Sequence, residues 1–515
     1  MNFFFRLNCS NKVGLGHFSR ISKIANYIKK QKHSVYFVVD NINELKNINL
    51  VHQTSELYKK NKFKNEKKDA QLFLKKIKNK KKGYIFLDDY RLGNIWKKYL
   101  KNNGYKIIHF DDKLILNKYS DYIINYGINT FNSKKKFKNN YLLGPKYALI
   151  DDISSNKVTK SKFFEIILYL GGAGNTDYFD NLSSEIKKKF LREKIKNFKI
   201  NIVLGPLVLN SLKFKSKYSS DKFINIISGE TNLIKIFKRS DLFIGSAGTS
   251  IYETSYADLP SILFKSNENQ NDIIPNLEKL GHYIYIDKKE FLDFKKVAKL
   301  CFLIFRNYKN VKKNFFKNKY KIDNQGSKRI FDSIINKYVI KNDYLKKENK
   351  IKKSKFEMAK ITDMNKIYEL RNERYIRRIS GNTRIIRKID HYLWWFENKD
   401  AYKIYTLKNQ GKILMVYWYK IMKLGKKNYT FNGWYSSKEL KFIEILYYIK
   451  KFNNSLLKKP QLICLTKKNN KLSLKIDQYL GYKKIVNINK DILKFLKRNG
   501  INLKNISLVT NKLNK

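Results

Sequence analysis

Cysteine is scarce in this chain of 515 residues, which has only Cys9, Cys301 and Cys464. An odd number at such wide spacings, without a C-x-x-C pair, argues against a disulfide framework and a zinc site and fits a reducing cytoplasm. Long hydrophobic runs are missing too. A membrane-spanning helix needs about 20 apolar residues, and no apolar stretch of the sequence approaches that length. The N-terminal sequence lacks the basic leader, long apolar core and cleavage site of a signal peptide, so we expect a first strand there.

Acidic residues are also few, with 43 Asp and Glu against 109 Lys and Arg and a net charge of +66. Such a balance raises the hypothesis of a nucleic-acid or anionic-membrane partner. The lysines, however, are spread along nearly the whole chain and accompany Asn, Ile, Tyr and Phe, which are the residues of A/T-rich codons. We therefore interpret the charge as genomic composition bias and expect no nucleic-acid partner. A real attraction for polyanions stays open as the alternative.

What the chain does contain is enough apolar material for several cores, with 43% hydrophobic and 15% aromatic residues. Single cores stop growing near ~250–300 residues, so about three domains are expected. Short apolar runs alternate with helix-length amphipathic segments, and this pattern predicts parallel sheets whose strands are buried on both faces. Two such series in succession predict two Rossmann-like α/β domains. The runs are 3–7, 34–39, 84–87, 105–110 and 122–125, then 164–170, 200–204, 223–227, 242–244, 261–264 and 283–286.

Composition also places the domain boundaries. We predict an N-terminal Rossmann-like domain at 1–150 and a second at 151–337, joined in a polar stretch with Gly and Pro. Residues 338–355 are rich in Lys, Asn and Glu and are expected to form a linker. Helices followed by strands then predict an α+β domain at 356–500, with a tail at 501–515.

A glycine-rich turn, Gly14-Leu15-Gly16-His17, directly follows the first predicted strand and precedes a helix. Glycines allow a tight turn, and the start of a helix leaves backbone N–H groups facing the crevice of such a sheet. At that position the imidazole of His17 could exchange a proton near neutral pH. A helix-capping turn with an incidental histidine is the alternative that these residues leave open.

Paired carboxylates, Asp88-Asp89 and Asp111-Asp112, each close an apolar strand. The carboxyl ends of parallel strands line the ligand crevice, so these side chains could orient His17 or bind sugar hydroxyls. Capping of the next helix by Asp is the alternative.

Small residues follow three strands of the second series. The segment Gly245–Glu253 has the glycines, hydroxyls and helix start of a phosphate cradle, although it is not a Walker loop. A shorter loop, Gly171–Asn175, and the amide-rich stretch Asn267–Gln270 occupy equivalent positions. No set of His, Cys, Asp or Glu has metal-ligand spacing. A plain strand-to-helix turn remains the alternative for the first of these loops.

These motifs occur together in the order of one known family. The chain up to the predicted linker resembles the UDP-sugar hydrolases of pseudaminic acid biosynthesis, which act on UDP-2,4-diacetamido-2,4,6-trideoxy-β-L-altropyranose. That family is related to spore-coat polysaccharide proteins and has the two-domain glycosyltransferase-B fold. The matching segments are Arg6 in the first strand, Gly14–Arg20, Asp88–Tyr90, Asp111–Asp112, Ile124–Asn125, Leu143–Leu149, the two glycine loops and Asn269–Gln270.

The resemblance implies a cytoplasmic enzyme that supplies sugars for flagellin glycosylation or surface polysaccharide. His17 would act as general base on a water that attacks the anomeric carbon, with UDP as leaving group and no metal or cofactor. The implied substrate-binding residues are Arg6, Gly16, Arg20, Asp89, Tyr90, Tyr147, Asn269 and Gln270. The implied nucleotide-binding residues are Gly172, Ala247, Gly248, Thr249, Ser250 and Glu253, the last of which would hold the ribose.

Three positions depart from the family pattern and bear on the sugar rather than on the reaction. Asn8 stands where the family often has Asp, and Ala173-Gly174 replace a usual Ser-Asp. Ile150-Asp151 stand close to where an Arg is usual. A UDP-sugar glycosyltransferase of the same fold is the alternative function, and a non-catalytic polyanion binder is a third.

The last predicted domain resembles GNAT-type N-acetyltransferases of the same sugar pathways. The similar segments are Leu370–Glu373, His391–Phe396 and Asn470–Ser473 with Leu480–Tyr482. The glycine-rich turn that would cradle the pyrophosphate of acetyl-CoA is replaced by Tyr435–Leu440. Acetyl-CoA binding is therefore one reading of this domain, and a degenerate structural or substrate-holding domain is the other.

Overall fold

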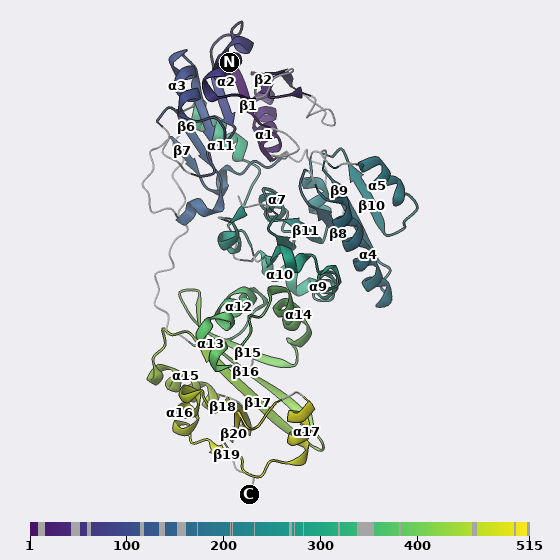
Figure 1. Cartoon of the computed structure of the whole chain (residues 1–515), viewed down its shortest axis with the longest axis vertical. Coiled ribbons are helices and arrows are strands. Elements are labelled where there is room, and N and C mark those ends of the chain that lie inside the picture. Colours follow the sequence, from purple (N-terminus) through teal and green to yellow (C-terminus); the bar gives the residue numbers. More distant parts are fainter. Residues whose placement is uncertain are drawn as a thin grey trace. The chain divides into compact units, whose positions relative to one another are not determined.

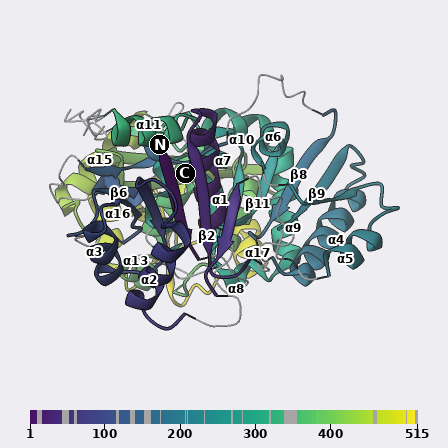
Figure 2. The same cartoon turned by 90° about the horizontal axis from the view of Figure 1, so that it is seen from above.

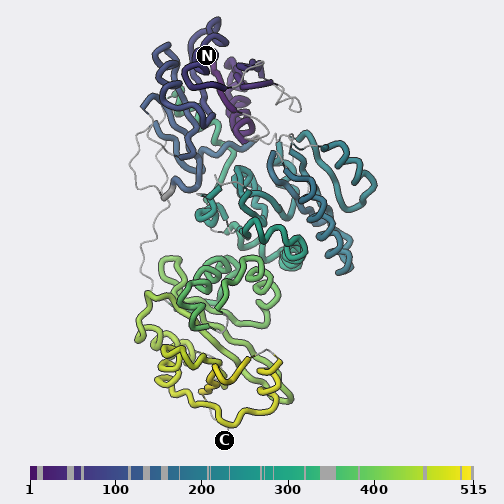
Figure 3. Tube along the Cα trace, in the orientation of Figure 1, coloured from purple at the N-terminus to yellow at the C-terminus, as the bar shows by residue number. Residues whose placement is uncertain are grey.

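The computed structural model divides the chain into two compact units, Met1–Leu345 and Lys346–Lys515. Figure 1 and Figure 3 draw the first unit from purple to green and the second from green to yellow, and Figure 2 gives a second view. The structure describes residues 1–8, 16–42, 52–58, 63–113, 118–132, 140–151, 161–172, 174–205, 208, 210–230, 232–266, 270–271, 273–281, 283–317, 320–336, 355–380, 383–455, 461–498 and 501–511. All but the last residue of the predicted linker, 338–355, lies outside them.

The N-terminal half of the first unit is a parallel sheet in the order β3-β2-β1-β4-β5-β6-β7. Chain order reverses between β1 and β4, and at such a point the carboxyl ends of the strands open a crevice for ligands. The strands are β1 Asn2–Leu7, β2 Ser34–Val39, β3 Gln53–Glu56, β4 Tyr84–Asp88, β5 Lys106–Phe110, β6 Tyr122–Asn125 and β7 Tyr141–Leu143. The helices are α1 Gly16–Lys30, α2 Glu66–Ile77 and α3 Asn94–Asn102, with short turns η2 Ile128–Asn132 and η3 Pro145–Tyr147.

The sequence of β1 explains why this sheet is covered on both faces. Alternate side chains point to opposite sides of a strand, so Phe3 and Phe5 join the core beneath α1. Phe4 joins a second core with Phe73 and Trp96, which come from α2 and α3. All three phenylalanines are essentially inaccessible to solvent. The continuous apolar run of this strand therefore reflects two buried faces, as predicted.

The second half of this unit is another parallel sheet, ordered β10-β9-β8-β11-β12-β13. The two predicted Rossmann-like α/β domains are thereby confirmed. The strands are β8 Phe164–Tyr169, β9 Phe198–Leu204, β10 Ile224–Ser228, β11 Leu242–Ser246, β12 Ser261–Phe264 and β13 Ile284–Ile286. The helices are α4 Thr176–Arg192, α5 Ser211–Lys217, α6 Ile234–Arg239, α7 Ser250–Tyr256, α8 Lys288–Phe291, α9 Phe294–Arg306, α10 Tyr308–Phe315 and α11 Gly326–Ile335, with the turn η5 Ile274–Lys279.

The helix α11 returns to the N-terminal half and packs against α1 and η3 (Figure 1). The ring of Phe331 lies 6.3 Å from that of Phe3, and Arg329 donates to the carbonyl of Lys146 at 2.8 Å. A Cβ atom on Gly326 would lie 2.0 Å from the carbonyl oxygen of Ala148. The close approach of the two backbones therefore requires glycine at the start of this helix.

The second unit has one mixed sheet, ordered β14-β15-β16-β17-β18-β20-β19. Its neighbours are antiparallel except β17 and β18, which run parallel and pair only from Thr430 to Asn432 with Leu462 to Cys464. The strands are β14 Phe356–Met358, β15 Tyr402–Asn409, β16 Lys412–Leu424, β17 Lys427–Ser436, β18 Leu462–Lys467, β19 Lys483–Lys484 and β20 Ile506–Thr510. The helices are α12 Met364–Asn372, α13 Arg374–Ile379, α14 Lys388–Asn398, α15 Phe442–Ser455, α16 Lys471–Tyr479 and α17 Lys490–Arg498, with the turn η6 Ile361–Asp363.

One boundary prediction in this unit was wrong. Residues 501–515 were expected to form a tail, but Ile506–Thr510 is the strand β20, inserted between β18 and β19. Its β-branched and apolar residues favour a strand, and its pairing with β18 is nonlocal. Among the helices that the structure describes in either unit, none is both long and apolar enough to cross a membrane.

A buried carboxyl group makes the stability of the second unit depend on pH. Asp477 is 4% exposed and accepts a hydrogen bond from Thr466 Oγ1 at 2.9 Å. Burial raises the pKa of Asp477 from its usual value to about 6. Because the folded state holds this proton more tightly than the unfolded state, its stabilising effect is complete at low pH and is lost as pH rises through about 6.

We expect Asp477→Asn to stabilise the second unit at pH 8 by about 1–3 kcal/mol, because it removes a buried charge while keeping an acceptor for Thr466. The gain should vanish near pH 4. Denaturant unfolding followed by tryptophan fluorescence measures it, since Trp394, Trp395, Trp418 and Trp434 all lie in this unit. Equal gains at both pH values would contradict a raised pKa. Thr466→Val is the control for loss of the hydrogen bond alone.

Candidate active site

One face of α1 carries three polar side chains at three-residue intervals, His17, Arg20 and Lys23. Residues three apart on a helix lie on the same side, so all three point toward one region. The helix begins at Gly16, directly after the stretch that follows β1. Gly14 and Leu15 of the predicted turn lie outside the described residues.

The imidazole of His17 is held by a carboxylate from the end of β4. His17 Nδ1 lies 2.6 Å from Asp88 Oδ1, and the Asp88 side chain is inaccessible to solvent. An ionised carboxylate can only accept, so Nδ1 carries the proton of this hydrogen bond and Nε2 presents its lone pair. The edge of the Tyr90 ring packs against the imidazole at 4.8 Å between centroids. The arrangement leaves one nitrogen available as a base and fixes its direction.

Arg20 holds both oxygens of the same carboxylate, including the one that contacts His17. Its Nε donates to Asp88 Oδ2 at 2.5 Å, and its NH1 donates to both oxygens of Asp112 at 3.0 Å. The hydroxyl of Tyr90 donates to Asp112 as well. Burial alone would raise the pKa of Asp88, but the charges of Arg20 and His17 lower it well below its usual range. Asp88 therefore stays ionised across the pH range in which a histidine titrates.

Arg6 lies in the interior and its donors are used by the protein. The side chain is completely buried and forms a two-pronged pair with Asp69, at 3.2 and 2.7 Å. It also donates to Asp40 at 2.6 Å and to the carbonyl of Leu7 at 2.8 Å. The expected contact of Arg6 with substrate stays a prediction. Because an arginine has five donors in a fixed plane, these partners make it a residue that positions the carboxyl ends of the strands.

Asp89 and Arg91 form the outer part of the same ion network. The guanidinium of Arg91 pairs with both oxygens of Asp89, at 2.9 and 2.6 Å, and with both oxygens of Asp40, at 2.8 and 3.0 Å. Asp89 is 2% exposed, whereas the side chain of Arg91 is 28% exposed. Asp89 was predicted to bind substrate, and the structure places it behind Arg91 rather than at the surface of the crevice.

The predicted phosphate cradle lies between β11 and α7. The backbone N–H of Ala247 donates to Phe264, which ties the turn to β12. Thr249 is exposed at the start of α7, where its hydroxyl does not cap the helix, and Gly248 and Ser250 flank it. A Cβ atom on Gly245 would lie 2.1 Å from the carbonyl of Tyr169, so this glycine lets β11 approach β8.

Glu253 joins the two halves of the first unit through an ion pair. Its Oε1 lies 2.6 Å from Lys23 Nζ, and Asp151 lies 3.8 Å from the same ammonium group. Nearby, the hydroxyl of Tyr252 accepts from the backbone N–H of Ile128 at 3.1 Å. The polar face of α1 and the start of α7 therefore lie side by side.

Two further predicted residues are buried, and a third, Gly172, is partly buried. The Gln270 amide bonds with Ser246 at 2.9 Å and with Ser266 at 3.0 and 2.9 Å, so it braces the loops beside the turn. Tyr147 is 1% exposed and belongs to the core, and its expected contact with substrate stays a prediction. The carbonyl of Gly172 packs against Gly205, where a Cβ atom would lie 2.4 Å away. Asn269 lies outside the described residues.

Several members of this region were not singled out from the sequence. Lys23 could have been found from its spacing after His17 and Arg20 along the helix. Asp40, Asp69 and Arg91 gave no local signal, because each takes its importance from a partner distant in sequence. In the part of the chain that the structure describes, no group of three or more His, Cys, Asp or Glu side chains could hold a metal ion.

Comparison with known proteins places the chain near a curated relative without a known activity. No protein-family model matches it. The uncharacterized protein MJ1062 of Methanocaldococcus jannaschii is 26% identical over 285 residues, which cover 51% of this chain and 55% of the relative. The chain thus spans about half the length of that relative.

Among solved structures, several are similar to about two thirds of this chain. MurG of Acinetobacter baumannii is 10% identical, with a TM-score of 0.44, and covers 66% of this chain and 100% of its own. MnaA of S. aureus, solved with UDP, is 13% identical with a TM-score of 0.44 and covers 66% and 99%. The UDP-GlcNAc 2-epimerase of Neisseria meningitidis, bound to UDP-GlcNAc, is 10% identical with a TM-score of 0.44 and covers 65% and 100%. The likeness is one of fold, and no activity is carried over from it.

The buried pairing of Arg6 gives a direct test of its structural role. We expect Arg6→Met to lower the stability of the N-terminal half by about 3–5 kcal/mol, because it leaves Asp69 buried without its cation. Arg91→Met, at a partly exposed position of the same network, should cost less, because Asp40 and Asp89 keep Arg6 as a neighbouring cation at 2.6 and 3.7 Å. Hydrogen-exchange mass spectrometry of peptides from β1 and α2 measures both changes. Similar protection in the two variants would show that burial does not set the strength of this pair.

Proposed function

We propose that this chain hydrolyses a UDP-linked diacetamido-trideoxy-hexose to the free sugar and UDP. The observation that carries the proposal is the pairing of His17 Nδ1 with Asp88 at 2.6 Å. It creates a base at the carboxyl ends of the strands, where ligands of doubly wound sheets bind. The resemblance of the ordered motifs to the pseudaminic acid pathway hydrolases supports the sugar and the leaving group.

In the proposed reaction, His17 Nε2 takes a proton from a water molecule while the water oxygen attacks the anomeric carbon. The bond between that carbon and the β-phosphate oxygen breaks, and its electron pair leaves with UDP. Asp88 stabilises the imidazolium that forms, because it is ionised and already hydrogen-bonded to Nδ1. Direct displacement by water inverts the anomeric centre. The chemistry uses groups of this chain and water only.

Arg20 and Tyr90 give this base its fixed direction. Arg20 donates to both oxygens of Asp88, and Asp112 links Arg20 to the hydroxyl of Tyr90. Tyr90 is 54% exposed, so its ring can contact the sugar while its edge packs on the imidazole. Pre-oriented groups lower the barrier because no reorganisation is needed at the moment of reaction.

The nucleotide is proposed to bind at the turn before α7. Backbone amides around Gly248, Thr249 and Ser250 would stabilise the diphosphate, which gains charge as the bond to the sugar breaks. Glu253 Oε1 is paired with Lys23, which leaves Oε2 to accept from the ribose. Lys23 is then placed to offset the negative charge that the nucleotide brings.

We expect His17→Ala to abolish the release of UDP from UDP-2,4-diacetamido-2,4,6-trideoxy-β-L-altropyranose, followed by NMR without an acceptor. Asp88→Asn should lower kcat by about 10³–10⁴, because the neutral amide no longer holds the reactive tautomer. His33→Ala, at the amino end of β2, is the matched control and should keep full activity. Release that persists without His17 would overturn the mechanism. Release that needs an added acceptor would establish a glycosyltransferase instead.

Glu253→Gln tests the nucleotide site separately. We expect the Kd for UDP and the KM for the sugar nucleotide to rise by about 10–100-fold, as for the loss of a charge-assisted hydrogen bond, with kcat little changed. Calorimetric titration with UDP measures the first quantity. Glu193→Gln, at the C-terminal end of α4, is the control. A large fall in kcat at unchanged affinity would contradict a role limited to the ribose.

A further inference from the structure

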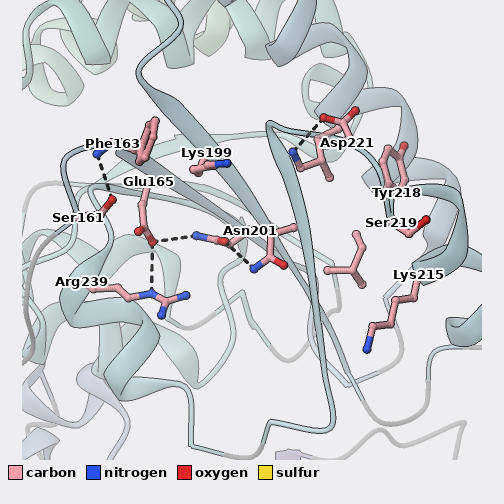
Figure 4. Close-up of a pocket in the computed structure, with 13 residues that line it drawn as sticks. Ser161, Phe163, Glu165, Lys199, Asn201, Lys215, Tyr218, Ser219, Asp221 and Arg239 are labelled. Atoms are coloured by element: carbon pink, nitrogen blue, oxygen red, sulfur yellow. Dashed lines mark hydrogen bonds and ion pairs between the residues drawn. The ribbon is translucent and has the colours of Figure 1, made fainter.

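A polar cavity of about 610 Å³ lies in the second half of the first unit, apart from the crevice (Figure 4). Its floor is the amino-terminal part of β8, β9 and β10, where Glu165, Lys199 and Asn225 lie. The crevice, in contrast, follows the carboxyl ends of the strands. The cavity volume falls in the range of about 300–1,000 Å³ that small-molecule sites occupy.

The two faces of these strands differ in polarity. On one face Phe164 and Phe198 pack against aromatic rings of α9 and α4, at 5.0 Å to Phe305 and 4.8 Å to Phe190. On the other face lie Glu165 and Asn201, which are buried where a parallel sheet ordinarily has apolar side chains, and Asn225, which is exposed on the edge strand β10. This departs from the predicted burial of both faces.

These polar side chains form a hydrogen-bonded row across the sheet, and Figure 4 shows its part from Arg239 through Glu165 to Asn201. Asn225 Nδ2 donates to Asn201 Oδ1 at 3.2 Å, and Asn201 Nδ2 donates to Glu165 Oε2 at 2.9 Å. Arg239 Nε lies 3.3 Å from the same Glu165 oxygen. Glu165 is 8% and Asn201 3% exposed. Burying a carboxylate and an amide costs free energy of folding, so we expect the row of polar side chains to have a role besides packing.

The charges of the lining are mostly matched internally. Lys199 donates to the carbonyl of Lys222 and lies 5.2 Å above the Phe163 ring. Asp221 pairs with Lys187 at 2.5 Å, and Arg239 pairs with Glu165. Among the described residues of the lining, Arg239 is a cation with an ion pair, whereas none is found for Lys199 or for Lys215, which lies on α5.

The groups left over favour a ligand that both donates and accepts. Each amide of the row has further donor and acceptor capacity, and Glu165 Oε1 offers an acceptor. A sugar hydroxyl can donate and accept hydrogen bonds at the same time. A polyphosphate, in contrast, would be repelled by the carboxylates of Glu165 and Asp221. A metal cation would be repelled by the positive charges of Lys199, Lys215 and Arg239.

The apolar part of the lining points to the same class. Phe163 belongs to the lining beside the polar row. Its ring offers a surface for the nonpolar face of a pyranose ring or for the methyl of an acetamido group. We propose that this cavity is a second binding site, which takes a neutral acetamido-sugar unit through Glu165, Asn201 and Asn225. It is separate from the crevice and does not depend on the hydrolysis proposed above.

The test uses the full chain and N-acetylglucosamine as the probe, observed by saturation-transfer difference NMR with UDP present to occupy the crevice. Asn225→Leu and Glu165→Gln should each weaken the signal by about fivefold or more, as for one lost hydrogen bond. Lys213→Ala, on the exposed side of α5, is the matched surface control and should leave it unchanged. Thermal unfolding of each variant confirms that the fold is kept.

The site assignment is overturned if the wild-type protein gives no saturation transfer, or if both floor variants keep the full signal. A signal that UDP removes would place the sugar in the crevice and also overturn it, while leaving the proposed reaction intact. Uptake of inorganic phosphate that is lost in Lys215→Ala would replace the neutral sugar with an anion. Conversely, an inactive crevice with a floor-dependent sugar signal would support this site and reject the hydrolase.

Discussion

The candidate active site depends on one buried carboxylate, that of Asp88 at the end of β4. It accepts from His17 through one oxygen and from Arg20 through both, and both partners come from the same helix. These charged hydrogen bonds hold α1 to the end of β4, where the order of the strands reverses between β1 and β4. A buried carboxylate without such partners would be expelled or protonated. Here His17 and Arg20 keep Asp88 ionised, and their hydrogen bonds to Asp88 fix the positions of both side chains.

A second group of buried, paired charges lies in the interior of the N-terminal half. Arg6 lies among Asp40, Asp69 and Asp89, and Trp96 donates to Asp69 at 2.8 Å. Loss of Arg6 would leave the carboxylate of Asp69 buried without its cation. The ends of three neighbouring strands and α2 are thereby held in register beneath the crevice. Positioning of the site rests on paired charges more than on apolar packing.

The sequence predicted those features that have local signals. Apolar runs and their alternation with helices indicate the two parallel sheets, and His17 after a glycine turn indicates the mouth of the crevice. The roles of Arg6 and Tyr147 could not be read in this way. Burial of Arg6 depends on Asp69, which lies 63 residues away, and Tyr147 is covered by a helix from the far end of the unit. Local patterns identify polar residues near a strand end, but only the fold decides which of them face solvent.

In the second unit, too, local sequence patterns predict the class of fold but not the order and direction of the strands. Helices followed by strands predict an α+β domain, and the mixed sheet has that character. The parallel pairing of β17 with β18 and the insertion of β20 depend on contacts between distant segments. A short β-branched run such as Ile506–Thr510 carries a weak signal by itself, because strand preference depends on the neighbours it pairs with.

The return of α11 to the N-terminal half means that this half is not a continuous piece of chain. Phe3 near the N-terminus and Phe331 share one core. During synthesis, the surface of α1 and η3 therefore stays uncovered until residues 326–335 have left the ribosome, long after the first sheet is complete. A fragment ending at residue 150 would expose the same apolar surface permanently. The two halves are in this sense one folding unit, closed by its last helix.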